Sequence, residues 1–593
     1  LRRMGKNLMF CLPPCRPLKA REQVSASHSP APLPNWRYTA SLTPSEPPMT
    51  KPTPPRDLLE WLGITDSPNW HVARPLGIIT SGLLALLIIG AIFAAFAILY
   101  GVIFSSGAET AVGKLGAGAL IVAILGAPFL VWGTVIKQKT VDFQKESHIT
   151  DRISKAVEQL GAEKTVKKLN DEGQTVETTE PNIEVRIGGL LSLERIAQDS
   201  TRYDKGRDHV LVMEILCAYV RENSNARPPE DYPEPEWEPL RDNATEEERK
   251  AHLAARKERF GGFLTKSKAS NWARSLPKPR ADIQQVLDIL GRRTAEQRLN
   301  EARWGKDAAP DATWVFDTPC PALPDGPSKV PLSPEALAAY IAELNIWKKT
   351  IVSYRGYRLD LRGANLQAAD LSKALLSGAR LEKARLEGAN LGGAQMQGAI
   401  LVGAQMQGAD LVSAQMQGAD LSKAQMQGAD LYSAKMQGAH FSEAKMHGAF
   451  LSSAQMQGAI LVGAKMQGAF LSHAQMQGAF LPLAKMQGAD LKRAQMQGAH
   501  LMRAQMDPST NLTAALLHGA SLKKVDETTI TQVLPYLDQM FSDASVSLPE
   551  GTARPAHWPD WKLPLDGPNA FDTQWKLWLS DPDGYKPPEK PAG

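Results

Sequence analysis

The sequence predicts a multi-domain chain, in which a two-helix transmembrane hairpin, an α-helical domain and a repetitive solenoid with a C-terminal cap follow one another. Three observations lead to this prediction. Two long apolar segments without charge lie between residues 76 and 136, helical periodicity recurs between 141 and 300, and a five-residue repeat runs unbroken from Leu361 to Met506. The net charge of +4 is too small to indicate a nucleic-acid-binding protein.

The N-terminal segment 1–55 shows no periodicity, and its first 48 residues are rich in Pro and Ser, so we expect it to be disordered. Met49 precedes the amphipathic stretch Asp57–Leu62. We therefore expect Met49 to be the natural start and residues 1–48 to be an over-extended gene start. The apolar run begins only about 75 residues into the chain, which argues against a signal peptide.

Residues 56–140 predict the membrane hairpin. The segments 76–104 and 115–136 contain 29 and 22 residues without a charge, and each is long enough to cross a hydrocarbon core of about 30 Å. Arg and Lys residues flank the outer ends of the pair, while the short connecting loop carries one Lys and one Glu. The positive-inside rule then predicts a multi-pass protein of the inner cell membrane with both termini in the cytoplasm.

Residues 141–300 predict a helical domain with a charged, disordered or loosely helical insertion at 224–280. A juxtamembrane helix is expected over 141–169. Further helices are expected at Asp208–Arg221 and Ala281–Arg293, and a Pro-rich linker at 301–350. Between the helices expected at 141–169 and Asp208–Arg221, another helix is expected to carry an apolar stripe of Ile187, Leu190, Leu191 and Ile196.

Five polar residues of this domain raise the question of a functional site: Glu194, Arg195, Asp208, His209 and Glu214. Salt-bridged helix faces are the commoner explanation of such a pattern. The four cysteines, Cys11, Cys15, Cys217 and Cys320, lack metal-ligand spacing and fit free thiols in a reducing compartment. The sequence predicts no catalytic residue, no metal site, no cofactor and no enzymatic activity.

Within the repeat, every fifth residue is Leu, Met or Phe, and the residue two positions earlier is almost always Ala. Residues two apart on an extended strand point to the same side, so Ala364 and Leu366 face inward while Asn365 faces outward. Two further residues must then turn the chain through a corner. Glycines such as Gly363 and Gly398 are common there, as corners with unusual backbone angles favour. The chain over 351–525 is therefore expected to wind around an axis.

The triplets Ala364-Asn365-Leu366, Ala409-Asp410-Leu411 and Ala489-Asp490-Leu491 fit the A(D/N)Lxx motif. The region resembles the pentapeptide-repeat family, and the chain as a whole resembles bacterial membrane-anchored members of it. The resemblance implies a right-handed, four-sided parallel β-helix with four pentapeptides per coil. Thirty units would then give seven and a half coils, or about 36 Å of rod.

From Ala394 onward the repeat doubles to ten residues, with Met and Leu or Phe alternating at the centres. In a four-sided rod this pattern makes two opposite faces nearly invariant and two variable. The Met columns are interpreted as core filling rather than as a redox or metal site, because their thioethers face inward. Residues twenty apart stack, so an outward glutamine ladder is expected: Gln397, Gln417, Gln437, Gln457, Gln477 and Gln497.

The variable faces are the predicted contact surfaces. Phe450 and Phe470 fall on one of them, and Ile460 and Phe480 on the opposite one. These four residues are the candidate contacts for a protein partner, because exposed apolar patches usually indicate an interaction. Scattered surface residues or a self-dimer seam remain alternatives.

The repeat breaks at Asp507-Pro508-Ser509-Thr510 and resumes one residue out of phase at Ala515, which predicts a bulged last coil. Residues 526–593 are expected to cap the open end of the solenoid. A short helix is expected at 528–543, followed by four tryptophans that would cover the exposed core: Trp558, Trp561, Trp575 and Trp578.

These features predict a non-enzymatic, membrane-anchored scaffold that presents a rigid rod to a cytoplasmic protein partner or to a second copy. An accessory or regulatory role in an oligomeric channel or transport assembly is the alternative. Some relatives mimic DNA and bind topoisomerases, which needs an acidic surface. Residues 359–525 instead hold 15 Lys and Arg against 10 Asp and Glu, so neither mimicry nor nucleic-acid binding is favoured.

Overall fold

The computed structural model describes residues 149–169, 174–203, 205–233, 245–260, 268–305, 307–323 and 333–591, with a few helical positions between 89 and 137. Two compact units are distinguished, Leu1–Lys139 and Thr140–Gly593. The predicted N-terminal segment and both predicted membrane spans lie outside the described residues, apart from those few positions. Among the residues that are described, no helix combines the length and the apolar character needed to cross a bilayer.

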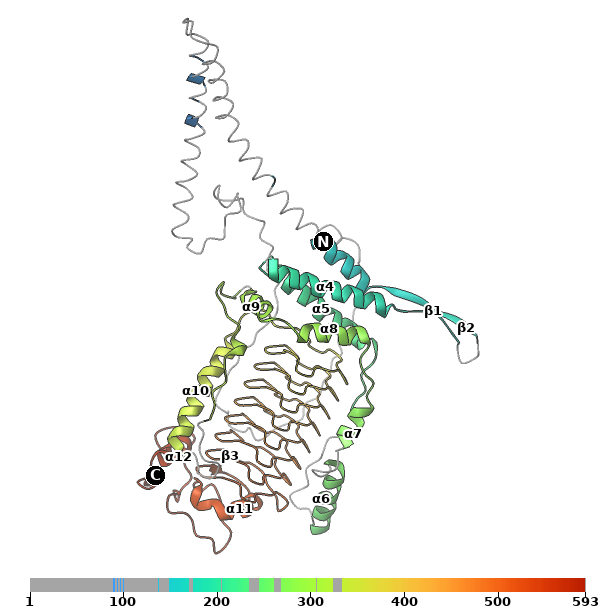
Figure 1. The fold of residues 1–593 in the computed structure, drawn as a ribbon. Coiled ribbons are helices and arrows are strands. Elements are labelled where there is room, and N and C mark those ends of the chain that lie inside the picture. Colours follow the sequence, from blue (N-terminus) through green and yellow to red (C-terminus); the bar gives the residue numbers. More distant parts are fainter. Residues whose placement is uncertain are drawn as a thin grey trace, which may run out of the picture. The chain divides into compact units, whose positions relative to one another are not determined.

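The repeat forms a β-helix with twenty residues per coil (Figure 1). Parallel bridges join each outward residue to the one twenty positions later, as in Asp360↔Arg380 and Ile400↔Asp420. The N–H of each centre donates to the next coil, for example from Leu401 to the Asp420 carbonyl at 2.7 Å. Four pentapeptides therefore make one coil, as the resemblance implied.

The inward assignment is confirmed. The Ala, Leu, Met and Phe residues at the inward positions are almost all fully buried, including every methionine from Met396 to Met496. The last corner residue of each unit has a positive φ, +61° at Gly398 and +67° at Gly403. Non-glycine residues adopt the same conformation at several corners, among them Ser453 and Leu483.

The predicted bulge is present, because the bridge spacing changes from twenty to twenty-one residues at Asp490↔Asn511. Strand β3 (His500–Met502) pairs in parallel with β4 (Ser521–Lys523) across this step. Helix α11 (Glu527–Val533) then changes to the 3-10 helix η3 (Leu534–Gln539), with Pro535 in its first turn. The predicted helix is thus present in two parts.

The C-terminal segment covers the end of the rod (Figure 1). Trp558 lies in the same hydrophobic cluster as the rod core, with its indole N–H 2.7 Å from the Met540 carbonyl. Helix α12 (Phe571–Ser580) contributes Trp578 to a second buried cluster with Phe541. The Trp575 indole N–H donates to the Gly519 carbonyl at 2.9 Å. These contacts are those expected of a cap.

The helical domain differs in part from the prediction. Residues 149–160 are helical, but β1 (Glu163–Leu169) forms an antiparallel hairpin with β2 (Thr175–Pro181) where the continuation of that helix was expected. Thr and Val occur in both segments, and Lys164 and Lys167 of β1 stand opposite Glu180 and Glu177 of β2, which favours strand pairing. The hairpin is largely exposed.

Helix α4 (Ile183–Tyr203) carries the predicted stripe on a rotated face, because Leu190, Leu193 and Ile196 are buried whereas Leu191 is exposed. Helix α5 (His209–Asn223), followed by the short 3-10 helix η1 (Ser224–Ala226), buries its apolar residues Val210, Met213, Leu216, Cys217 and Val220. Helices α8 (Ala281–Gly291) and α9 (Ala295–Arg303) complete the domain.

This domain closes the N-terminal end of the rod, and the two share one hydrophobic core. The Leu375 N–H donates to the Gly291 carbonyl at 2.9 Å, and a Cβ on Gly291 would lie 3.0 Å from the Ala374 Cβ. The β-helix is therefore capped at both ends by segments that precede and follow it.

Helices α6 (Glu246–Phe260), α7 (Lys268–Ser275) and α10 (Pro334–Val352) lie along the rod (Figure 1). In the segment predicted to be a linker, the 3-10 helix η2 (Val315–Asp317) precedes α10, which begins at the N-cap Ser333. In the predicted insertion, α6 and α7 are helical.

Candidate interaction faces of the solenoid

Helix α10 packs along one corner of the rod. Its inner residues Leu337, Leu344 and Ile351 meet successive corner glycines from Gly498 back to Gly398. A Cβ on Gly458 would lie 2.8 Å from the Leu344 Cδ2. The invariant glycine of this column therefore allows the helix to approach the backbone closely.

Helix α7 meets the opposite corner. A Cβ on Gly388 would lie 2.6 Å from the Ala273 carbonyl oxygen, and a Cβ on Gly408 would lie 2.7 Å from the Ala269 carbonyl oxygen. Each coil thus has two opposite glycine corners, and where contacts are described these corners are covered by the chain's own helices. The ten-residue period of the sequence places glycine at both of these corners.

The glutamine columns lie at the same covered corners, so the expectation that they face outward is wrong. Gln457 is only 3% exposed, and Gln477 and Gln497 are similarly buried. Their ladder is diagonal rather than vertical: the Gln457 amide group donates to the Gln475 Oε1 at 2.7 Å, eighteen residues away. The Gln457 Oε1 itself is buried without a partner among the described residues.

The first open face is called the Phe450 face and consists of the outward residues Asp410, Asp430, Phe450, Phe470 and Asp490. The Phe450 and Phe470 rings stack with their centroids 4.9 Å apart and their planes 8° apart. Asp430 and Asp490 continue the column on either side of the stack. Burial, followed by the neighbouring Asp410, raises the pKa of Asp430 despite a hydrogen bond from the Tyr432 N–H.

The second open face is called the Phe480 face and consists of the outward residues Ile400, Asp420, His440, Ile460, Phe480 and His500. Phe480 is 40% exposed, and its ring centroid lies 5.0 Å from that of His500. His500 is held by the C-terminal cap through Asp572 at 3.4 Å. Burial lowers the pKa of His440, although Asp420 acts in the opposite direction.

The four candidate contacts therefore form two separate patches on opposite faces, as their spacing predicts. Sequence reasoning missed Leu483 and Tyr432, which are 46% and 48% exposed beside Phe480 and Phe450, respectively. Leu483 occupies an open corner with φ +60°. A bulky apolar side chain in this conformation is unusual. The five-residue repeat assigns residue 483 to a corner, so the sequence alone could have identified this leucine as exceptional.

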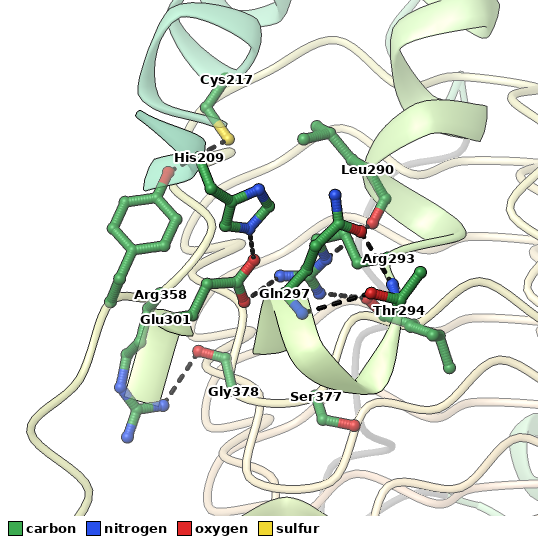
Figure 2. A network of polar contacts seen from close by, with 12 residues as sticks. His209, Cys217, Leu290, Arg293, Thr294, Gln297, Glu301, Arg358, Ser377 and Gly378 are labelled. Atoms are coloured by element: carbon green, nitrogen blue, oxygen red, sulfur yellow. Dashed lines mark hydrogen bonds and ion pairs between the residues drawn. The ribbon is translucent and has the colours of Figure 1, made fainter. Parts of the chain in front are cut away.

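The polar residues of the helical domain do not form one site. His209 joins a buried network with Glu301 of α9 and Arg293, which Figure 2 shows from close by. The His209 Nε2 lies 2.9 Å from the Glu301 Oε1, and the Arg293 Nη1 lies 2.6 Å from the Glu301 Oε2. Arg293 also donates to the Leu375 carbonyl of the rod at 2.6 Å. The network connects the helical domain with the first coil.

The other polar residues are dispersed. Glu194 and Arg292 form a bidentate ion pair with distances of 2.8 and 2.7 Å, which is the salt-bridged helix face that the pattern favoured. Arg195 lines a hollow between α4 and α9 together with Glu194. Glu214 lies on the far side of α5, where burial raises its pKa. Within the described ranges, no three His, Cys, Asp or Glu side chains are placed to hold a metal ion.

Comparisons with known proteins place the repeat in a wider group. The family model described as pentapeptide repeats matches in eight copies, including residues 360–398, 389–428, 399–438, 424–463, 434–472 and 464–503. A search of curated proteins found no match.

Solved structures are similar over part of the chain. HetL, a pentapeptide repeat protein involved in heterocyst differentiation regulation from the cyanobacterium Nostoc sp. strain PCC 7120, is 28% identical, with 34% of this chain and 86% of HetL covered and a TM-score of 0.26. QnrB1, a plasmid-mediated fluoroquinolone resistance protein, is 15% identical, with 26% and 78% covered and a TM-score of 0.19. At TM-scores this low, the similarity carries no argument about what this chain does.

Proposed function

Because this chain is a pentapeptide-repeat protein over residues 360–503, we propose that it is a membrane-anchored, non-enzymatic scaffold whose rod presents its two open faces to a cytoplasmic protein partner. The anchor in this proposal is the hairpin of segments 76–104 and 115–136, each an uncharged apolar stretch long enough to cross a bilayer. The cytoplasmic location rests on the basic residues that flank the pair.

The observation that supports the proposal best is that the chain's own helices cover two corners of the rod, whereas two faces are open and variable in sequence. The corner glycines from Gly398 to Gly498 lie where α10 packs, and Gly388 and Gly408 of the opposite column lie where α7 packs, so intramolecular contact accounts for glycine at these positions. The Phe450 and Phe480 faces vary from coil to coil, with Phe480 exposed and Phe450, Ile460 and Phe470 half-buried, and the exposed Tyr432 and Leu483 lie at the adjoining corners. Since the rod would fold with Asp or Asn at these outward positions, as other coils do, the aromatic residues favour a role in contact.

A rigid rod suits this role because its contact surface is ordered before binding, and little conformational entropy is lost on docking. Caps at both ends and helices along two corners hold the rod in one conformation. Residues 359–525 carry a net positive charge, which disfavours mimicry of DNA.

The test is an affinity capture of the full chain from solubilised native membranes, followed by mass spectrometry. The triple variant Phe450→Ser, Phe470→Ser, Phe480→Ser is compared with wild type. Ile346→Ser is the matched control, because Ile346 is 66% exposed on α10 and belongs to neither face.

We expect a cytoplasmic protein to be captured by wild type and by the control but lost from the triple variant. Equal capture by all three chains would overturn the assignment of the open faces. Recovery of the chain in the soluble fraction of lysed cells would overturn the membrane anchor.

A further inference from the structure

We propose that the Phe450 face of one copy binds the Phe480 face of a second copy, so that rods associate side by side in an open row. The inference rests on the proposed function, since it names the partner of the open faces. It follows from the placement of the two apolar patches, from the charges beside them and from their height along the rod.

The two patches are both apolar and lie on opposite faces. On the Phe450 face, the stacked rings of Phe450 and Phe470 adjoin the exposed Tyr432. On the Phe480 face, Ile460 and Phe480 adjoin the exposed Leu483 at the open corner. Exposed apolar surface of this kind is typical of a contact surface.

Leu483 is the most informative residue of the second patch. It has φ +60°, a conformation disfavoured for residues with a Cβ, and 46% of it is exposed to solvent. Neither burial in the rod nor backbone preference explains leucine at this corner. The adjacent corner of the preceding coil is Gly463, where a Cβ would meet nothing closer than 3.9 Å, so space is open beside Leu483.

The charges beside the patches are partly complementary. Asp430 and Asp490 continue the column of Phe450 and Phe470. Arg503 lies at the open corner one coil beyond Leu483, and Lys485 follows Leu483 on the adjoining side. Carboxylates thus stand at both ends of the Phe450–Phe470 stack and cations adjoin Leu483, which favours pairing of unlike faces. Lys492 and Arg493 beside Asp490 and Glu443 two coils before Leu483 have the opposite charges, so the complementarity is partial.

The heights of the patches also agree. Phe450 and Phe470 lie half a coil from Ile460 and Phe480, which corresponds to an axial offset of about 2.4 Å. Two parallel rods side by side therefore bring the patches together with almost no axial shift. Tethering of copies in one membrane would raise their effective concentration.

Because the patches are on opposite faces, a pair of copies leaves one patch of each kind unused. Such a heterologous contact does not close and continues into a row. A self-dimer that used one face twice would instead stop at two copies.

The experiment measures sedimentation velocity of the purified full chain in detergent over a range of concentrations. Variant one carries Phe450→Ser and Phe470→Ser, and variant two carries Phe480→Ser and Leu483→Ser. Other coils have Asp or Asn at the outward positions and Ser at the open corners, so both variants should fold, which thermal unfolding verifies. Ile346→Ser again serves as the control.

We expect wild type and the control to form progressively larger species with concentration, and each variant alone to remain monomeric. An equimolar mixture of the two variants should form a one-to-one complex and nothing larger, because each retains one intact face. This complementation is the decisive result.

Three outcomes would overturn the inference: a monomeric wild type at every concentration, a dimer formed by one variant alone, or a mixture that stays monomeric. If wild type is monomeric, the membrane capture can still show a protein that binds wild type and not the triple variant. That result would support the scaffold function and overturn the association of copies in a row. If self-association follows the predicted pattern and no other protein is captured, the second copy is the partner.

Discussion

Gly398 at a corner of the rod and Ile351 near the end of α10 are in direct contact, so that a Cβ on the glycine would overlap the Ile351 Cγ2. The same Cβ would lie 2.7 Å from the Phe316 Cε1. Gly403, the next corner of the same coil, has a similar φ but only the Lys383 Cγ at 3.8 Å. The glycines share a conformation and differ in their surroundings.

Replacing these two glycines with alanine separates backbone strain from helix packing. Gly403→Ala should lower the free energy of unfolding by about 1 kcal/mol, because an alanine at positive φ is strained. Gly398→Ala should cost an additional 1–3 kcal/mol, roughly the range for overpacking, because Ile351 and Phe316 must move. Chemical denaturation of both variants measures the difference. Equal losses would mean that α10 does not pack on this corner in solution.

Met456→Asp should destabilise the rod severely, because Met456 is fully buried in a column without polar partners. Gln457→Asp should also be destabilising, since Gln457 is buried at the corner that α10 covers. Ser453→Asp, at an open corner of the same coil, is the mild control, because aspartate tolerates positive φ. The loss of Tm in thermal unfolding ranks the three variants. An equal loss for Gln457→Asp and Ser453→Asp would contradict the conclusion that α10 covers the corner of Gln457.

Glu301→Ala should destabilise the junction between the helical domain and the rod by about 3–5 kcal/mol, because it leaves the buried Arg293 without its carboxylate. Glu194→Ala removes an ion pair whose arginine, Arg292, is half exposed, and should cost no more than about 1 kcal/mol. Urea denaturation of the two variants gives the comparison. A loss no larger for Glu301→Ala would argue against the buried network.

Asp282 gives a pH dependence whose sign follows from its surroundings. Burial raises the pKa of this carboxyl, but the Arg280 guanidinium and the Tyr219 hydroxyl outweigh it and hold the pKa below its usual 3.8. A carboxyl whose pKa falls on folding stabilises the protein above its unfolded pKa, and this contribution is lost as pH falls through the folded value.

Asp282→Asn should therefore lower Tm at neutral pH, and its deficit relative to wild type should shrink as pH falls below about 3.8. Asp288→Asn, on the exposed side of α8, should follow the wild-type profile. Calorimetric scans between pH 7 and 3 provide the data. A deficit that stays constant over that range would show that Asp282 does not titrate as described.

The rod was predictable because its information is local and periodic. Two-residue spacing fixes which side chains face inward, so the alternation alone assigns Ala364 and Leu366 to the core, where both are fully buried. The out-of-phase step after Asp507 likewise predicts a bulge in the right place. Helices α5 and α8 were predicted for the same reason, since each carries its own apolar stripe.

The errors arose where a longer-range contact decided the outcome. Gln457 occupies a position that faces outward in an isolated rod, and only the packing of α10 buries it. Gly161 directly follows the helix of residues 149–160, where a helix commonly ends, and the pairing of β1 with β2 determines the structure beyond it. Both depend on a partner that the local pattern does not reveal.

The sequence by itself thus determined the period, the inward columns, the corners and the opposite placement of Phe450 and Phe480, because each follows from backbone geometry within a few residues. Only the tertiary structure decided which corners are covered and how the rod is joined to its helical cap. The contact between His209 and Glu301 spans 92 residues of chain, and the packing of Ile351 on Gly398 joins a helix to a coil that begins later in the sequence. Such pairings depend on how separately formed elements dock, and no repeat or periodicity within either element encodes them.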